Sequence, residues 1–357
     1  MTYDVAIVGG GPAGASCASF CAQAGLRVLV LEREIFPREK VCGDCLNPAC
    51  WDVLRRLDVA ERVRLLPHAR LDRVEFIAVG GRSVAVDLPA GENAEIAVKR
   101  SLLDQLLLTR ARELGAEVVH SATVTALNKS SSGAWNLQTR GQDFRARAVI
   151  GADGRNSTVA RICNLLPGPQ RERVALQTHL PLPADFGNRV VLQFLKGGYS
   201  GQAPVGDESL NVCLVARARG TNALKDWATS RFEISRDHPW RTITPLTRSP
   251  IHPAHSHLLF IGDAARVVEP FTGEGIYYAL ASGELAARAL VRLQHGQNEA
   301  TVLREFAGAH AALYRGRLWI NRLARAAVLS PRVASFCVQA VRLQPALLRL
   351  LTAKIVR

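Results

Sequence analysis

The 357-residue sequence lacks a segment suited to span a membrane. Its longest run without a charged residue, Val5–Leu26, contains a glycine cluster and predicts a loop between a strand and a helix instead. Because the N-terminus enters a predicted strand at once, we expect no signal peptide. Eight cysteines without secretory signals indicate reduced thiols and a cytoplasmic protein. No nucleic-acid-binding motif is present, which argues against a nucleic-acid partner.

Acidic residues are scarce relative to basic ones: 31 Asp and Glu stand against 45 Lys and Arg, a net charge of +14. Residues 288–357 hold twelve basic side chains and only two acids, Glu299 and Glu305. Three interpretations stay open. The basic residues form a solvated face of a C-terminal helical layer, make a peripheral contact at the inner face of an anionic membrane, or dock an acidic carrier protein. A membrane contact would bring a lipophilic ligand to the protein.

The strongest motif lies in Tyr3–Glu32, where a buried strand, a glycine loop, a small-residue helix and a second strand follow one another. This βαβ pattern with GxGxxG at its first turn is typical of a dinucleotide site. Gly9 permits the tight turn, Gly11 lets a pyrophosphate approach the backbone, and Gly14 lets the helix pack closely. The helix N-terminus would hold the diphosphate, and Glu32 would accept hydrogen bonds from a ribose. The residues assigned to this site are Gly9, Gly11, Pro12, Ala13, Gly14, Glu32 and Arg33.

The segment Phe36–Pro48, FPREKVCGDCLNP, predicts a loop that carries two cysteines in CxxC spacing. Zinc or an iron–sulfur cluster would need a fourth ligand beyond Cys42, Cys45 and Cys50, and none follows at a suitable spacing, so we predict no metal. A redox-active thiol pair and a loop thiol with a packing role both stay open. Whether Cys42 and Cys45 form a disulfide is also open.

The remaining pattern predicts a mixed chain of strands and helices. A hairpin is expected over Val74–Leu88, a strand over Ile96–Arg100 and an amphipathic helix over Ser101–Leu114. Residues 174–218 change to alternating or apolar runs with short turns, which indicates an antiparallel sheet. A buried strand at Leu258–Ile261 and a long small-residue helix then return to the first fold.

These elements predict an α/β fold, with a Rossmann-type domain, an inserted antiparallel β-sheet domain and a C-terminal helical layer. The Rossmann-type domain would comprise residues 1–73, 95–170 and 250–295. The sheet domain would comprise residues 74–94 and 171–249, and the helical layer residues 296–357.

The predicted loops resemble those of a known fold. GxGxxG with Glu32, the segment Asp153-Gly154 and GDAA…PFTGEGI occur in this order in FAD-dependent oxidoreductases of the para-hydroxybenzoate-hydroxylase-like fold. The resemblance covers residues 3–290. Within that group, FPREKVCGD is similar to the geranylgeranyl reductase family, which carries Pro-x-x-x-x-Cys-Gly-Asp/Glu at this point.

The resemblance implies FAD and a role for each matching residue. Arg100 would reach the ribityl–phosphate region, Val124 would meet the adenine through its backbone, and Asp263 would bind ribityl or pyrophosphate oxygens. The remaining implied contacts are Asp153 at a phosphate or sugar, Gly275 and Ile276 under the isoalloxazine, and Cys42 and Gly43 close to the flavin ring. N–H donors of the loop that starts at Gly273 would lie near the pyrimidine end of the flavin. An electropositive flavin site would favour a thiolate at Cys42, whereas burial would favour the thiol.

The sequence also departs from the family. An aromatic stretch, Tyr-x-Trp-x-Phe-Pro…Asn, aligns with Tyr199…Asn211, but Gly201 and Ala203 replace the Trp and Phe. We assign Tyr199 and Asn211 to the substrate site, and the smaller wall argues against a long isoprenoid. Cys45 stands where the family more often has glycine. The Trp-x-Trp-x-Ile segment and lysine of flavin halogenases, which share the fold, are missing, which argues against halogenation.

Only one GxGxxG is present and no separate nicotinamide domain is encoded, so electrons would come from transiently docked NAD(P)H or a protein donor. We expect a reductase or dehydrogenase of a lipophilic isoprenoid- or polyketide-like small molecule, with hydride transfer at flavin N5 and Cys42 as the proton donor. Two alternatives stay open. One is a flavin monooxygenase that hydroxylates a small aromatic substrate, and the other is a flavoprotein that modifies a side chain of a partner protein.

Overall fold

The structure is a computed structural model that describes residues 1–131, 133–168, 173–206, 208–268 and 273–315. Its main sheet has a parallel core in the order β18-β11-β1-β2-β8. The strands of this core are β1 (Thr2–Val8), β2 (Val28–Leu31), β8 (Glu117–Val119), β11 (Asp143–Gly151) and β18 (Leu258–Phe260). This order, with β1 at its centre, is that of a Rossmann-type domain, so the predicted fold class is confirmed.

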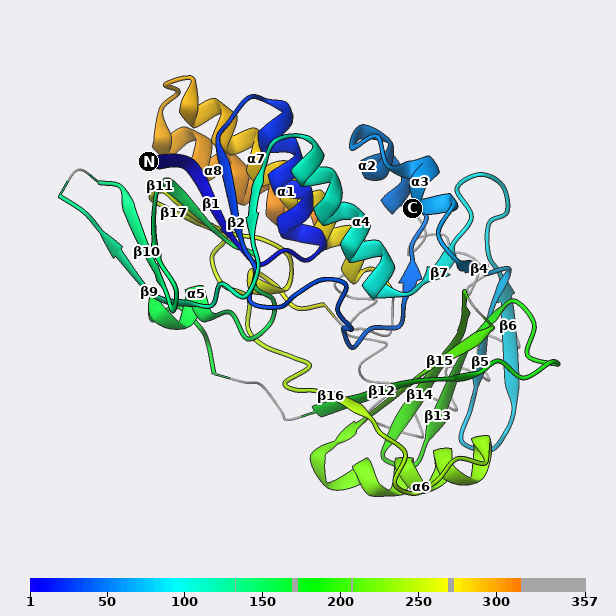
Figure 1. Cartoon of the computed structure of the whole chain (residues 1–357). Coiled ribbons are helices and arrows are strands. Elements are labelled where there is room, and N and C mark those ends of the chain that lie inside the picture. Colours follow the sequence, from blue (N-terminus) through cyan, green and yellow to red (C-terminus); the bar gives the residue numbers. More distant parts are fainter. Residues whose placement is uncertain (132, 169–172, 207, 269–272, 316–357) are drawn as a thin grey trace.

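Helices cover one face of the main sheet (Figure 1). They are α1 (Pro12–Gln23), α4 (Arg100–Glu113), α7 (Gly275–Gln294) and α8 (Glu299–Leu313). Val5 and Ile7 of β1 point into the core beneath these helices, while Ala6 and Val8 point into a second core on the opposite face. Helix α7 packs directly on α1, because a Cβ at Gly283 would lie only 2.5 Å from the Ala13 carbonyl oxygen.

The opposite face is covered by a hairpin and a short helix. β9 (Val124–Lys129) pairs with β10 (Trp135–Thr139), which in turn pairs with β11. α5 (Thr158–Ile162) follows β11, and β17 (Ala254–His255) extends the sheet beside β18.

The second sheet runs in the order β16-β12-β15-β14-β13-β5-β6. Its strands are β5 (Arg73–Ile77), β6 (Ser83–Asp87), β12 (Arg173–Pro181), β13 (Arg189–Leu195), β14 (Gly198–Val205), β15 (Ser209–Arg217) and β16 (Arg241–Ile243). The antiparallel sheet expected over 174–218 is therefore confirmed. The sequence missed the parallel pairing of β5 with β13 and the helix α6 (Thr221–Phe232), which lies on the outer face of this sheet (Figure 1).

A small sheet of β3 (Cys45–Leu46), β7 (Ile96–Val98) and β4 (His68–Arg70) lies between the two larger ones. Two expectations need correction here. Cys45–Leu46 was expected to be loop but pairs with β7, and Arg100 was expected to end a strand but opens helix α4. Cys45–Leu46 pairs with a distant segment of the chain, which local patterns do not encode. Strand β7 ends at Val98, and Arg100 instead binds Asp104 one turn further along α4. α2 (Cys50–Arg56) and α3 (Ala60–Arg64) complete this region.

The C-terminal helical layer is seen only in part. α8 belongs to it, while residues 316–357, with most of the basic side chains behind the expected membrane or carrier contact, lie outside the described residues. In the ranges that the structure does describe, no helix is both long and apolar enough to cross a bilayer.

His310 makes the stability of this helical region depend on pH. Its ring is 4% exposed between Phe306 and Tyr314, and its Nε2 has no hydrogen-bond partner among the described residues. Burial, helped by the charge of Arg266, lowers the pKa of His310 from 6.5 to about 4. The unfolded chain therefore binds the proton more tightly, so stability is complete above about pH 6.5 and falls as the pH drops towards 4.

We expect His310→Phe to remove this pH dependence. Between pH 7 and pH 5 the wild type should lose about 2 kcal/mol more stability than the variant, as measured by urea unfolding at both pH values. Equal losses in the two proteins would contradict a neutral, buried His310.

Candidate active site

The glycine loop after β1 is shaped by close backbone contacts. Gly9 has φ +105°, and a Cβ there would lie 2.6 Å from the Ala152 carbonyl oxygen. A Cβ at Gly14 would lie 1.9 Å from the Gly9 carbonyl oxygen, so the helix can follow the loop this closely only with glycine. Gly11 borders a large cavity. The nearest atom to a Cβ at this position would be Nη2 of Arg38 at 3.6 Å, so a ligand has room to approach the Gly11 backbone from the cavity.

Helix α1 begins at this open position without a side-chain cap. Its first backbone N–H groups and its dipole therefore face the cavity and favour an anion there. The start of α7, at Gly275 and Ile276, lines the same cavity and also has no side-chain cap. Two helix N-termini thus converge on one space.

Glu32 at the end of β2 is 5% exposed and borders the cavity. Its Oε2 accepts a hydrogen bond from Gly10 N at 2.7 Å, and its Oε1 accepts one from Glu34 N at 2.9 Å. Each carboxylate oxygen can accept a further bond, so Glu32 can still hold a ribose hydroxyl. Arg33 also lines the cavity and forms an ion pair with Glu34 at 3.3 Å.

Basic side chains gather where the phosphates of a dinucleotide would lie. Arg100 binds Asp104 through two hydrogen bonds of 2.7 and 2.8 Å, and Arg38 binds the same carboxylate at 2.8 Å. Burial and the nearby arginines lower the pKa of Lys40 to about 8. Sequence reasoning missed Arg38 and Lys40, although both stand in the FPREK segment it had singled out.

Arg155 and Asp153 each present a polar atom without a partner among the described residues. Arg155 Nη2 donates to Asp263 Oδ2 at 2.9 Å, but its Nη1 is buried and unpaired. Asp153 Oδ2 accepts from the N–H groups of Thr158 and Val159 at the start of α5, whereas its Oδ1 is buried and unpaired. Burial raises the pKa of Asp153. Unpaired buried groups at a cavity wall indicate that a polar ligand completes them.

One continuous cavity of about 600 Å³ collects most of the predicted site residues. Those that line it are Gly9, Gly11, Pro12, Ala13, Glu32, Arg33, Cys42, Gly43, Arg100, Val124, Asp153, Tyr199, Asp263, Gly273, Gly275 and Ile276. Two do not line it: Gly14 lies against the glycine loop, and Asn211 lies behind the cavity wall. The Pro270, Phe271 and Thr272 part of the predicted loop lies outside the described residues.

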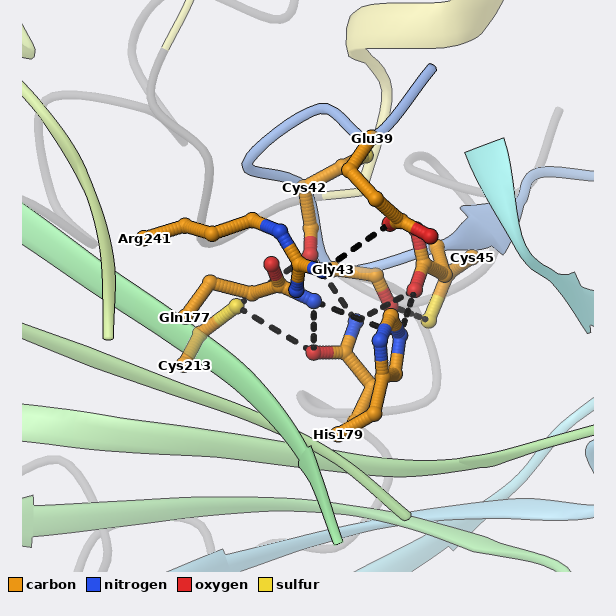
Figure 2. Close-up of polar contacts among 10 residues, drawn as sticks. Glu39, Cys42, Gly43, Cys45, Gln177, His179, Cys213 and Arg241 are labelled. Atoms are coloured by element: carbon orange, nitrogen blue, oxygen red, sulfur yellow. Dashed lines mark hydrogen bonds and ion pairs between the residues drawn. The ribbon is translucent and has the colours of Figure 1, made fainter. Parts of the chain in front are cut away.

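The loop that carries Cys42 is held by side chains from two neighbouring strands of the second sheet (Figure 2). His179 of β12 and Asn211 of β15 face each other across the strands and bind Asp44 Oδ2 at 2.8 and 2.9 Å. Asn211 also donates to the Cys42 carbonyl oxygen at 2.8 Å. The next cross-strand pair, Gln177 and Cys213, adds bonds to Asn211 Oδ1 and to the Cys42 carbonyl oxygen.

These contacts change the assignment of Asn211. Its side chain is 1% exposed and its amide binds Cys42, Asp44 and Gln177, so Asn211 positions the loop. Asp44, His179 and Gln177 were missed as site residues, because nothing in the local sequence relates position 44 to position 179. The only signal was Asp44 itself, in the KVCGD stretch.

The thiols around this loop are free and protonated. Cys42 and Cys45 are both free cysteines that line the cavity, so the structure has no disulfide between them. Burial raises the pKa of the Cys42 thiol, and the charge of Arg100 only partly opposes the shift. Of the two states left open by the sequence, the structure favours the thiol. Cys17 and Cys21 are fully buried on α1, as core residues.

Beyond the loop, the cavity continues as an apolar chamber over the inner face of the second sheet. Gly201 and Ala203 of β14 contribute small residues to its wall beside Leu192, which widens it. Few polar side chains reach it, and one of them is Glu95, whose Oε1 lies near Gly273. The apolar wall consists of Val74, Phe76, Leu88, Ala175, Val190, Leu192, Tyr199, Ala203, Val215, Ile243 and Leu246.

The site matches FAD on observations of the structure itself. The room beside Gly11, the two uncapped helix starts, the basic cluster and the unpaired Nη1 of Arg155 suit a pyrophosphate, and Glu32 suits the adenosine ribose. Val124 borders the same cavity where the resemblance places the adenine.

Comparisons with known proteins agree. A family model described as an FAD binding domain matches residues 2–177. The chain is 30% identical to menaquinone reductase of Mycobacterium tuberculosis over 320 residues, which cover 80% of this chain and 76% of that protein. It is 30% identical to geranylgeranyl diphosphate reductase of Rhodobacter capsulatus over 81% of this chain and 75% of that protein. A 28% identical relative, conditioned medium factor receptor 1 of Dictyostelium discoideum, matches 81% of this chain, which spans only 63% of that protein's length.

A solved structure of a triple mutant of a flavin-dependent brominase superposes with a TM-score of 0.81 at 21% identity, over 99% of this chain and 95% of that one. At 21% sequence identity, this structural similarity shows a shared fold and not a shared function. Together with the cavity, whose lining suits FAD, and the match to an FAD binding domain, the two 30% identical reductases show that this chain belongs to the geranylgeranyl reductase-like family of FAD-dependent oxidoreductases.

Proposed function

We propose that this enzyme reduces a carbon–carbon double bond of a lipophilic, isoprenoid- or polyketide-like molecule. The observation that carries the proposal is the apolar chamber, which opens directly onto the wall formed by Cys42, Gly43 and the start of α7. A chamber lined by aliphatic side chains favours an apolar substrate and keeps water from the reacting carbons. FAD supplies the hydride when bound and reduced.

The names of the relatives support the same chemistry. Geranylgeranyl diphosphate is an isoprenoid, and menaquinone carries an isoprenoid chain on a quinone ring. Gly201 and Ala203 leave a broader chamber than the Trp and Phe of the family's aromatic stretch would, so a substrate with a ring beside its chain suits it. NAD(P)H, docking transiently, is the electron donor that we propose, since the chain has one GxGxxG.

The test is to reduce the FAD-loaded enzyme with NADPH and to mix it with geranylgeranyl diphosphate or a menaquinone. Mass spectrometry should find a product that has gained two hydrogen atoms, and without air the flavin should be reoxidised only when substrate is present. Mixing the reduced enzyme with O₂ in a stopped-flow instrument should return oxidised flavin directly. A long-lived oxygenated flavin and a product that has gained an oxygen atom would favour the monooxygenase instead.

Cys42→Ser should leave FAD bound and lower turnover. The thiol lies on the cavity wall beside Arg100 and keeps its proton, so it can contact the substrate or the flavin edge. Serine preserves the size of the side chain but not its polarizability or acidity. Turnover is measured with the reduction assay above. The control is Cys163→Ser, because Cys163 is a free cysteine that does not line the cavity. Equal turnover in the two variants would show that the Cys42 thiol has only a packing role.

A further inference from the structure

Glu95 is a buried carboxyl group in the apolar chamber that the site described so far does not use. It stands directly before β7, and its backbone oxygen accepts a hydrogen bond from Leu71 N at 3.0 Å. Its side chain lines the cavity, and the residue is only 9% exposed. Among the described residues, its carboxyl group has no hydrogen bond or ion pair.

The position of this carboxyl is close to the predicted flavin end of the cavity. Its Oε1 lies 3.9 Å from where a Cβ on Gly273 would be, just before the start of α7. A negative charge on Glu95 raises the pKa of two nearby thiols. They are Cys45 of β3, on the cavity wall, and Cys50 of α2, in the core. Burial raises the pKa of both thiols, so neither competes with Glu95 for a proton near neutral pH.

A carboxyl group at such a place is unfavourable for the fold alone. Burial disfavours the charged form of a carboxyl group, a cost that an aliphatic side chain at the same position would avoid. Burial also raises the pKa of Glu95 to about 7, so that acid and carboxylate are both populated near neutral pH. Proton transfer is fastest from a group whose pKa is close to the working pH.

We propose that Glu95 is the acid that gives the substrate its proton when the double bond is reduced. The proposal rests on the proposed function. Reduced FAD, held by the glycine loop and the start of α7, would supply a hydride with both electrons to one carbon of the double bond and would end oxidised. The O–H bond of Glu95 breaks and a C–H bond forms at the neighbouring carbon. The Glu95 carboxylate then regains a proton from water.

Glu95 is a stronger acid than Cys42 at the pH of the cell. The pKa of the Cys42 thiol lies above its ordinary value of 9.0, whereas that of Glu95 is about 7. Glu95 therefore takes the proton-donor role first predicted for Cys42, which leaves the thiol to contact the bound groups.

The test compares Glu95→Gln with Glu92→Gln, an exposed carboxyl three residues away, and with Cys42→Ser. In the FAD-loaded enzyme, we expect single-turnover reduction of geranylgeranyl diphosphate or a menaquinone to slow about 100-fold or more in Glu95→Gln. The wild-type rate should fall above about pH 7. The same decrease in rate above about pH 7 should appear in Cys42→Ser and in Glu92→Gln, and it should be missing in Glu95→Gln.

A second measurement does not depend on turnover. Infrared difference spectra of the FAD-loaded protein should show a carboxyl C=O band that disappears with a midpoint near pH 7 in the wild type and in Glu92→Gln, and that is missing in Glu95→Gln. The flavin absorbance spectrum and thermal unfolding show that each variant is folded and loaded.

Three results would overturn the assignment to Glu95 while the reduction itself stands. The first is a Glu95→Gln variant that reduces the substrate at the wild-type rate. The second is a decrease in rate above about pH 7 that is missing in Cys42→Ser and present in Glu95→Gln. The third is a carboxyl C=O band with a midpoint near pH 7 that remains in Glu95→Gln. A wild-type enzyme that forms no saturated product from either probe removes the proposed function and this proposal together.

Discussion

Replacing Gly11 with valine is expected to give a folded but colourless protein. Gly11 has φ −69° and ψ −176°, an extended conformation that valine adopts readily. The nearest atom to a Cβ at this position is Nη2 of Arg38 at 3.6 Å, an ordinary van der Waals contact, so a Cβ fits there without a clash in the protein. It instead enters the space beside the start of α1, where the pyrophosphate of FAD has to approach the backbone.

The size of the effect follows from that collision. Placing extra methyl groups against a close-packed partner costs about 1–3 kcal/mol, and a difference of that size weakens binding about 5- to 150-fold. The flavin-to-protein ratio is read from the absorbance spectrum after purification and gel filtration. Gly308→Val, on the exposed side of α8 with no atom within 4 Å of a Cβ, is the control and should stay yellow. A fully flavinylated Gly11→Val protein would contradict the placement of FAD.

Asn211→Ala should give the largest loss of stability among single changes at the site. The substitution removes the donor to the Cys42 carbonyl oxygen, one of the two donors to Asp44 Oδ2 and the acceptor for Gln177 (Figure 2). Asp44 and Gln177 are buried, with relative exposures of 1% and 0%, so the groups left behind have little access to water. Each unsatisfied buried group costs about 1–3 kcal/mol, and we expect a total loss of about 3 kcal/mol.

Thermal and urea unfolding measure this loss, and alkylation of Cys42 measures the loop. If Asn211 positions the loop, Cys42 should be alkylated faster in the variant than in the wild type, because local opening requires less free energy. The control is Asn93→Ala, which removes a single exposed hydrogen bond with Arg55 and should change stability by less than about 0.5 kcal/mol. Unchanged stability and unchanged alkylation in Asn211→Ala would show that the loop is held by other contacts.

The FAD half of the site could be predicted because its chemistry is local. The turn, the helix start and Glu32 fall within one βαβ unit, and the contact that requires glycine at position 14, with the Gly9 carbonyl oxygen, lies inside that unit. The contact of Gly9 with Ala152 of the next parallel strand region appears only in the folded structure. Alternating residues likewise predicted the second sheet, because side chains along a strand alternate between its two faces.

The loop around Cys42 could be predicted only in part. The CGD stretch marked the place, but Asp44 is held by His179 and Asn211, more than a hundred residues further along the chain. The sequence pattern therefore assigns Asn211 to the substrate and gives no sign of the role of His179. The pairing of Arg155 with Asp263 was missed for the same reason.

By itself, the sequence determined that the chain has a Rossmann-type nucleotide site, an inserted antiparallel sheet and the family's cysteine loop. These features depend on spacing over a few tens of residues, and glycine geometry and strand alternation carry that information along the chain. Only the tertiary structure decided which carboxyl groups are buried and which atoms meet. Glu95 in AEIAV reads as one more charged residue until β7, the CGD loop and the second sheet enclose it, because burial is a property of the segments that surround a side chain.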